Sequence, residues 1–558
     1  MAPSQKMRIV AKDPALVSGE NRTIVTALVD VPREELDGGP RGHRAVVIDF
    51  NASTGKLYAP PSADELEAFR GGLTDAEILG NPRFHAQHTF AIVMRTLARF
   101  ELALGRRVSW GFDGQQIKIA PHAFVGANAF YSRRDQALLF GYFRTEQKPV
   151  FACLAHDVVA HETTHALLDG LRERYMDLSH PDQAAFHEAF ADIVALLSFF
   201  SLADVVGQLL PPTAGSDASL IDEGELSIAA LKKSALMALG EEMGLGMQRG
   251  GALRRSVELD PERARELSDE SHDRGEILVA AVMNTFLAAW RDHLEPHFRR
   301  HPKLDRGRAI EVGTAVADRL LTTLIRALDY SPPVDVRFED YLSAALTSSA
   351  ELSPDDDKYR LRALLREQFA RYGITPPDGA TADGYWTPYD AQPHARALRY
   401  DRSHFDSLQR DPEEVFRFLW ENRDALGLSS DAYTRVLSVR PCLRVDPDGF
   451  TLRETVAEYK QILHTTAGSL PRGVERPSSM PSDHELALHG GGVLVFDQFG
   501  RLKYHVYQHL VGKRQTARLH SLWEAGLLRS KKSVRQATAA LHLERLYDVE
   551  RNQPEVWS

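Results

Sequence analysis

The stretch Asp157–Gly170, DVVAHETTHALLDG, places two histidines four residues apart and a glutamate directly after the first. On an α-helix, residues i and i+4 lie one above the other on the same face. The imidazoles of His161 and His165 can therefore reach one metal ion, and Glu162 lies beside the first of them. The other faces of this predicted helix are apolar, which argues against a polar stripe on a solvated helix. The pattern predicts a zinc site.

The third ligand is expected from Phe186–Leu197, FHEAFADIVALL. A catalytic zinc has three protein ligands and keeps one position for water. A third histidine six residues after His165 is not available, because leucine stands there. Glu188 instead begins a second predicted amphipathic helix, with Asp192 one turn further on the same face. Two acids at this spacing repel each other unless a cation or a histidine proton lies nearby. We therefore predict Glu188 as a ligand and Asp192 as the acceptor for a ligand histidine.

These motifs resemble those of the thermolysin-like, or gluzincin, metallopeptidases. DVVAHETTHALLDG is similar to the zinc-helix signature of that family, and HEAFAD is similar to its third-ligand segment. The resemblance spans residues 45–375 and implies a zinc-dependent endopeptidase in which Glu162 accepts a proton from the attacking water. The chain departs from the family pattern in several respects. The gap between His165 and Glu188 is longer, and the calcium-binding acids expected after the third ligand are not evident.

The resemblance extends upstream to NAFY, Asn128–Tyr131, which looks like the edge strand that pairs with the substrate backbone. An edge strand can hold an extended peptide by β-addition. Asn128 and Ala129 are the positions implied to make those contacts with a peptide or protein substrate.

Downstream, SHDRGEILVAAV places His272 before a predicted helix, similar to the histidine that stabilises the oxyanion in this family. GALRRSVELDP looks like the segment whose arginine binds the substrate carbonyl, and Arg254 is the matching position, with Arg255 a near rival. A cationic or hydrogen-bonding group is what a developing oxyanion requires. Asp269 or Glu270 could orient His272, and the sequence does not decide between them.

Composition narrows the function classes. The chain has 558 residues, of which 43% are hydrophobic and 26% charged, as expected for a soluble protein of two or three domains. A net charge of −10 gives no global basic field, so we predict no nucleic-acid partner. The apolar stretch from Ile193 to Leu210 falls short of a membrane span and the N-terminus lacks a signal-peptide pattern, so we predict a cytoplasmic protein without a membrane partner. The two cysteines, Cys153 and Cys442, exclude a disulfide framework and are predicted to be small buried apolar residues.

The predicted architecture is α+β and, by resemblance, two-lobed with the zinc cleft between the lobes. Residues 1–150 are expected to form a β-rich lobe with the substrate-binding strand, and residues 151–375 a helical zinc-binding lobe. A Gly- and Pro-rich linker is predicted at 376–390. Residues 391–558 form an extension of unknown role, with a hairpin turn expected at Phe499–Gly500.

Two alternatives remain open. The protein could be a narrow intracellular peptidase that processes one partner protein, with the C-terminal extension restraining it or selecting the substrate. It could instead be a latent or non-catalytic peptide-binding or sensor protein on a peptidase scaffold, regulated by that extension. Glu162 argues against a pure binder, since binding needs no base.

Overall fold

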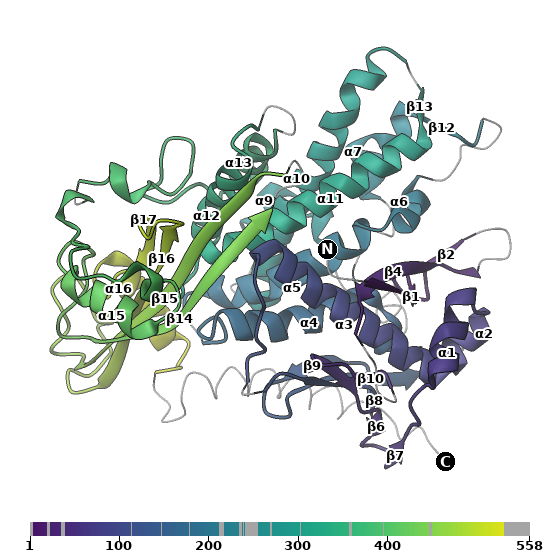
Figure 1. The fold of residues 1–558 in the computed structure, drawn as a ribbon, viewed down its shortest axis with the longest axis horizontal. Helices are drawn as coiled ribbons and strands as arrows, with labels where there is room; N and C mark the ends of the chain where they lie inside the picture. Colours follow the sequence, from purple (N-terminus) through teal and green to yellow (C-terminus); the bar gives the residue numbers. More distant parts are fainter. Residues whose placement is uncertain are drawn as a thin grey trace.

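The computed structural model describes residues 4–18, 23–34, 39–112, 114–146, 148–177, 179–210, 217–233, 237, 239, 255–267, 270–301, 303–356, 360–393, 395–445 and 449–528. Helices and sheets are mixed along the chain, so the predicted α+β class is confirmed (Figure 1). The helices form the middle of the molecule, with a sheet from the N-terminal part on one side and a sheet from the C-terminal part on another.

The N-terminal sheet supplies the strand that lies against the zinc helix. It contains β5 (Ala45–Val47), β8 (Ile117–Val125), β9 (Ala129–Ser132), β10 (Ala137–Arg144) and β11 (Pro149–Phe151). β8 is parallel to both β5 and β10, whereas β9 and β11 are antiparallel to β10. β9 pairs with the first half of β10 and β11 with the second half, so both lie along one edge of β10.

Shorter strands and helices cover the N-terminal end. β1 (Ser4–Val10) pairs with β4 (Thr26–Pro32), β2 (Val17–Ser18) with β3 (Thr23–Ile24), and β6 (Phe50–Asn51) with β7 (Lys56–Leu57). α1 (Ala63–Ala68) and α2 (Asp75–Gly80) both begin with capping boxes.

Three buried helices make up the centre. α3 (Pro82–Leu104) is capped by Asn81 at its start and has proline at its first position. Gly105 caps its end, with a φ of 66° that suits glycine. α4 (His156–Leu171) carries the zinc-helix motif, and α5 (Pro181–Phe200) packs against it. Glu188 was predicted to begin its helix, but α5 begins at Pro181, so Glu188 lies two turns inside. The earlier start follows from the cap on α5, where His180 accepts a hydrogen bond from the backbone N–H of Asp182.

The helical part continues beyond α5. Its further elements are α6 (Ala203–Leu209), β12 (Leu220–Asp222), α7 (Ile228–Lys232), α9 (Pro261–Ala264), α10 (Ser271–Phe298), β13 (Lys303–Asp305), α11 (Arg306–Ala327), α12 (Phe338–Leu352) and α13 (Leu361–Arg371). α10 packs along α5, which also packs against α4.

The C-terminal extension is built on an antiparallel sheet. β14 (Tyr433–Val445), β15 (Thr451–Thr466), β16 (Glu485–Asp497) and β17 (Leu502–Gln508) follow one another in chain order. The predicted hairpin is confirmed between β16 and β17, where Gly500 has a φ of 78° and the Asp497 carboxylate accepts a hydrogen bond from Phe499 N at 2.8 Å. This part of the chain also contains three helices, α14 (Phe405–Leu408), α15 (Pro412–Glu421) and α16 (Lys513–Glu524).

This sheet shares its core with the helical part. The main hydrophobic cluster, which contains residues of α3, α4 and α5, also contains Cys442, Val456, Val493, Val495, Tyr504 and Val506. The predicted linker, residues 376–390, contacts the helical part, where Trp386 Nε1 donates a hydrogen bond to the Tyr330 carbonyl at 2.8 Å. Where one domain ends and the next begins stays a prediction.

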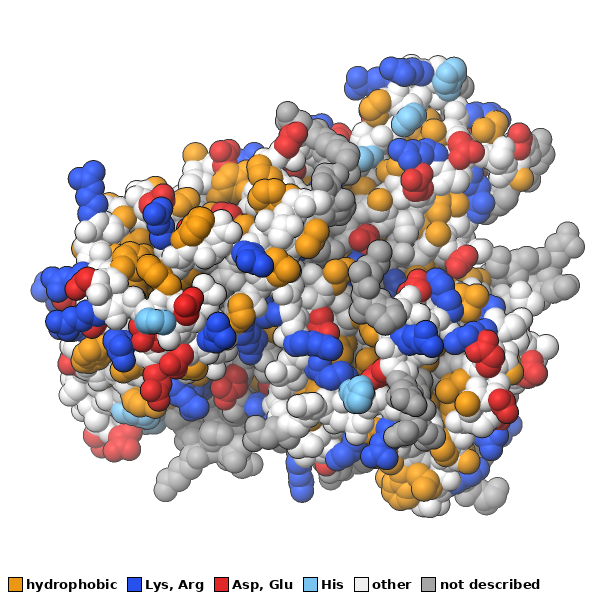
Figure 2. Space-filling view, in the orientation of Figure 1, with side chains coloured by type: hydrophobic (Ala, Val, Ile, Leu, Met, Phe, Trp, Pro, Cys, Tyr) orange, Lys and Arg blue, Asp and Glu red, His pale blue; other side chains and the backbone are white. Residues whose placement is uncertain are grey.

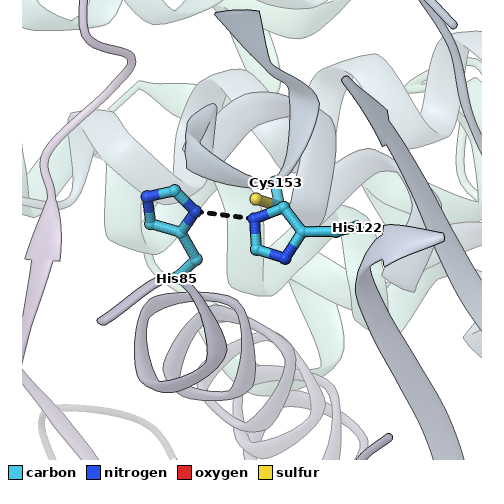
Figure 3. A group of neighbouring side chains, drawn as sticks. All are labelled: His85, His122 and Cys153. Atoms are coloured by element: carbon cyan, nitrogen blue, oxygen red, sulfur yellow. Dashed lines mark hydrogen bonds between the residues drawn. The ribbon is translucent and has the colours of Figure 1, made fainter. Parts of the chain in front are cut away.

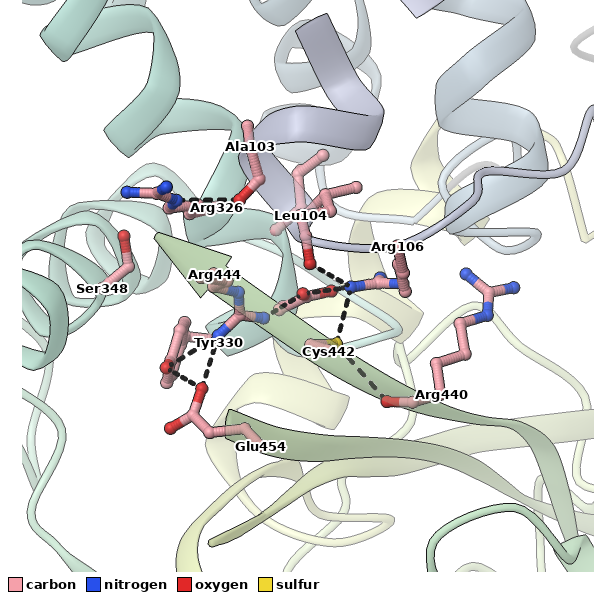
Figure 4. A network of polar contacts seen from close by, with 12 residues as sticks. Ala103, Leu104, Arg106, Arg326, Tyr330, Ser348, Arg440, Cys442, Arg444 and Glu454 are labelled. Atoms are coloured by element: carbon pink, nitrogen blue, oxygen red, sulfur yellow. Dashed lines mark hydrogen bonds and ion pairs between the residues drawn. The ribbon is translucent and has the colours of Figure 1, made fainter. Parts of the chain in front are cut away.

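Buried ion pairs join the same two parts (Figure 4). Arg444 of β14 is paired with Asp329, which follows α11, and with Glu454 of β15. Arg106, just after α3, also pairs with Asp329, and all of these side chains are almost completely buried. At the end of α4, Arg172 Nη1 lies 2.9 Å from Glu458 Oε2 of β15. The last turn of the zinc helix is therefore fixed directly to the C-terminal sheet.

Candidate metal centre

α4 and α5 bring the predicted zinc ligands together. Nε2 of His161 and Nε2 of His165 are 2.9 Å apart. Glu188 Oε2 lies 3.6 Å from the first nitrogen and 3.8 Å from the second. One ligand atom from each residue thus lies within 4.8 Å of the others, and the three side chains are buried or half-buried. The structure places the three predicted ligands where a single ion could touch all of them.

Asp192 lies where the sequence predicted it. Its Oδ1 is 2.7 Å from Nδ1 of His161, with both side chains largely buried. A carboxylate can only accept, so His161 carries a hydrogen on Nδ1, and the neutral ring presents the lone pair of Nε2 toward His165 and Glu188. This arrangement fixes the tautomer that a metal ligand needs.

His187 supports the second histidine, and the sequence reasoning missed it. Its Nδ1 lies 2.7 Å from Nδ1 of His165, and the two rings are nearly parallel. One of the two nitrogens carries the hydrogen of this contact, and if it is that of His165, then Nε2 of His165 is left as a lone pair facing the site. The signal was present in the sequence, because His187 directly precedes the predicted ligand Glu188.

The electrostatics of the centre favour a bound cation. Burial opposes charge on Glu188, but the nearby imidazoles of His165, His161 and His272 outweigh it and hold the pKa of this carboxyl well below its usual value. Burial likewise opposes charge on His161, yet its bond to Asp192 and the charges of Glu188 and Glu162 raise the pKa of the ring to about 10. The site therefore collects negative charge that binds a proton strongly, and that a metal ion could neutralise instead.

The donor set fits zinc. Two imidazole nitrogens and one carboxylate oxygen are among the ligands that catalytic zinc sites use. Tetrahedral zinc with bonds of 2.0–2.1 Å separates two ligand nitrogens by about 3.3 Å, so the His161–His165 spacing would open by only a few tenths of an ångström. The two facing nitrogens are otherwise a poor arrangement, because both cannot be lone pairs at 2.9 Å without a cation between them.

Glu162 lies between the metal ligands and the edge strand. Its Oε2 accepts a hydrogen bond from Tyr131 N of β9 at 3.0 Å. On the other side of β9, Gly141 N donates to the Asn128 carbonyl at 2.8 Å. Because backbone groups alternate along an antiparallel strand, those of Ala129 and Tyr131 point away from β10. Ala129, predicted to contact substrate, is thus on the outer edge, whereas Asn128 uses its carbonyl within the sheet.

A second contact ties β9 to the zinc helix. The Tyr131 hydroxyl donates to Asp169 Oδ2 at 3.0 Å, and Arg133 Nη1 lies 3.2 Å from Asp169 Oδ1. Asp169, in the last turn of α4, is almost completely buried. Burial and then the Asp169 charge raise the pKa of Tyr131 well above its usual value, so the hydroxyl stays a donor. The sequence reasoning did not single out these residues, although Asp169 belongs to the quoted motif.

His272 reaches the centre from α10. Its Nδ1 lies 3.4 Å from Glu188 Oε2, and its side chain is 32% exposed. Glu270, one of two acids considered for orienting this ring, uses its carboxylate to accept from the backbone N–H groups of His272 and Asp273 at the start of α10. Arg254 and Asp269 lie outside the described residues, and the rival Arg255 lies 2.8 Å from Glu258 on the surface.

A cavity lies away from the metal centre. It measures about 560 Å³ and is lined by Glu223, Gly224, Ser227, Ile228 and Arg291, none of which belongs to the metal centre. The metal centre is the candidate functional site because titratable groups converge there, whereas the cavity offers an ion pair of Arg291 with Glu223. On the face in Figure 2, basic and acidic side chains are interspersed.

One described helix, α5, is long and apolar enough to cross a membrane by length and composition. Its apolar window is 94% buried within the protein, as is typical of a core helix. Neither the known protein-family models nor the curated protein sequences contain a match to this chain.

Proposed function

We propose that the protein is a zinc-dependent metalloendopeptidase of thermolysin-like architecture. The observation that carries this proposal is the convergence of His161, His165 and Glu188 beside Glu162. Three protein ligands with a carboxylate next to them are typical of a catalytic zinc, whereas structural zinc sites usually have four protein ligands.

The residues divide into a metal-binding set and a proton-transfer group. His161, His165 and Glu188 would hold the ion, with Asp192 orienting the first histidine. When bound, zinc polarises the scissile carbonyl and lowers the pKa of the attacking water. Glu162 would accept the proton of that water and pass it to the leaving amine. Its bond to Tyr131 N fixes the position of this carboxylate beside the proposed metal ligands.

The substrate would lie along the outer edge of β9. The Ala129 carbonyl on that edge can accept from an extended peptide, as from an added strand, whereas the Ala129 N–H donates to Asn128 Oδ1 at 2.8 Å. Because Tyr131 of the same strand holds Glu162, the base and the substrate register are set by one element. His272, half-exposed and next to Glu188, can donate to the oxyanion that forms at the scissile carbonyl.

The test compares the wild type with Glu162→Gln on a panel of unfolded proteins and peptides, with bound zinc measured in each sample. Glu311→Gln, on the exposed side of α11, is the matched control. We expect cleavage by the wild type and the control, a loss of about 10²–10⁴-fold in Glu162→Gln, and zinc in all three.

Three results would contradict the proposal. If the wild type binds no zinc, or if Glu162→Gln cleaves as fast as the wild type, the assigned centre is wrong. If all variants bind zinc and none cleaves, the latent or peptide-binding alternative replaces the peptidase. The expected cytoplasmic placement stays a prediction.

A further inference from the structure

A second group of metal-binding side chains is buried away from the centre described above. His85 comes from α3, His122 from β8, and Cys153 from the 3₁₀ turn Ala152–Leu154 that leads into α4. One ligand atom from each lies within 4.8 Å of the other two. Their exposures are 1%, 2% and 0%. Figure 3 shows the two imidazoles facing each other, with the sulfur beside the ring of His122.

The hydrogen bonds of the two histidines fix where their protons are. His85 Nε2 lies 2.8 Å from the Ile78 carbonyl, which can only accept, so this nitrogen carries the hydrogen. His122 Nδ1 lies 2.8 Å from Asp49 Oδ2, so it too carries a hydrogen. When both rings are neutral, the remaining nitrogens, Nδ1 of His85 and Nε2 of His122, are both lone pairs, and they face each other at 2.8 Å.

Two facing lone pairs at this distance repel unless a cation lies between or beside them. His161 and His165 show the same arrangement at 2.9 Å. In both clusters a carboxylate holds the far nitrogen of one imidazole, Asp192 in the first and Asp49 in the second. Such a carboxylate–histidine pair is the usual support of a metal-ligand histidine.

The surroundings of the second cluster are aromatic. The centroid of the Phe151 ring lies 4.8 Å from that of His85 and 5.5 Å from that of His122. Tyr58 and Tyr142 also pack on His122. Among the described residues, the cluster offers one thiol and two imidazoles. Thiolate and imidazole together select thiophilic ions such as zinc or monovalent copper, and disfavour magnesium and calcium.

We propose that His85, His122 and Cys153 bind a second metal ion, a thiophilic d¹⁰ cation of the Zn²⁺ or Cu⁺ type. The Cys153 thiol loses its proton on binding, and the thiolate together with the nearby Asp49 carboxylate balances the charge of the ion. The ion would join α3, β8 and the residues that lead into α4. It would therefore brace the start of the helix that carries the catalytic centre, without touching the substrate.

A proton is the competing occupant. One of the two facing nitrogens could be protonated and donate to the other, with Asp49 balancing the imidazolium. Burial first, and the His122 charge second, hold the pKa of His85 well below its usual value. The experiment must therefore distinguish a bound metal from a bound proton.

The test uses full-length protein produced with zinc and copper available, and measures metal by mass spectrometry. The variants are His161→Ala, which removes a ligand of the first centre, and Cys153→Ser, which removes one from the second. We expect two metal equivalents in the wild type and one in each variant. The element lost in Cys153→Ser identifies the second ion as zinc or copper.

Cobalt gives a second readout that does not depend on the folding of Cys153→Ser. Protein grown with cobalt should show a thiolate-to-cobalt charge-transfer band, which the first centre cannot produce because it contains no sulfur. We expect the band in the wild type and in His161→Ala, even if Cys153→Ser does not fold. No band, together with a single metal equivalent that disappears in His161→Ala, would overturn the proposal and leave the proton as occupant. The proposed peptidase activity would be unaffected by that result.

Discussion

Replacing Asp192 with asparagine tests the metal centre through a residue that is not itself a ligand. The substitution keeps the shape and an accepting oxygen 2.7 Å from His161 Nδ1, and removes the negative charge. The Asp192 side chain is 4% exposed, so solvent does not screen the lost interaction. A hydrogen bond to a charged group contributes about 1.5–3 kcal/mol. Because about 1.4 kcal/mol corresponds to a factor of ten, we expect the Kd for zinc to rise about 10–100-fold.

The Kd is best measured by competition with a chromophoric chelator at constant pH. Asp424→Asn is the matched control, since that side chain is 94% exposed and far from any proposed ligand in the sequence. We expect the control to bind zinc as the wild type does. A Kd for Asp192→Asn within twofold of the wild type would refute the assigned role of this carboxylate.

Two predictions concern stability. Asp329→Asn should leave Arg106 buried without its carboxylate partner and remove one of the two carboxylates paired with Arg444, which keeps Glu454. We expect the free energy of unfolding to fall by about 3–5 kcal/mol, and a loss under about 1 kcal/mol in urea titrations would contradict this. For His505, burial and then His509 lower the pKa of the ring to about 3, so the unfolded chain binds a proton first as the pH falls below about 6.5. Wild-type stability should then decrease toward pH 3 by up to about 1.4 kcal/mol per pH unit from this group, and His505→Gln should lack that part of the slope. Equal slopes in the two proteins would rule out this source.

The parts of the centre that the sequence predicted depend on local spacing. His161 and His165 share a face because they are one helical turn apart, and Glu188 and Asp192 share one for the same reason. Each pair could be placed on its own helix from the sequence alone. That the two faces meet is a property of the packing of α4 on α5, and the sequence indicated it only through the resemblance to a family.

The second histidine cluster could not be predicted, because its members are far apart in the chain. His85 and His122 are separated by 37 residues, and they lie on a helix and a strand. Cys153 was predicted to be a small buried apolar residue, and it is buried as expected. Its neighbours, however, are imidazoles, and no local pattern links these positions.

The burial of charged residues in the C-terminal extension also depends on residues far away in the chain, so no local pattern predicts it. Arg444 stands in β14 with Arg435 and Arg440, and Glu454 in β15 with Glu458 and Lys460, and charged residues are typical of a solvated surface. In the structure, the helical part covers that surface and the side chains of Arg444 and Glu454 are buried. Burial of a charge in this way depends on Asp329 and Arg106, more than one hundred residues earlier in the chain.

The core shared by the C-terminal sheet and the helical part has a consequence for how the molecule can be controlled. Cutting the chain after residue 390 would expose the apolar side chains that Val456, Val493 and Val495 now cover. We therefore expect that removing the extension unfolds the rest of the protein. We expect both parts to unfold in one cooperative transition. A signal received by the extension would have to reach the zinc helix as a shift within a single folded unit, through contacts such as that of Arg172 with Glu458.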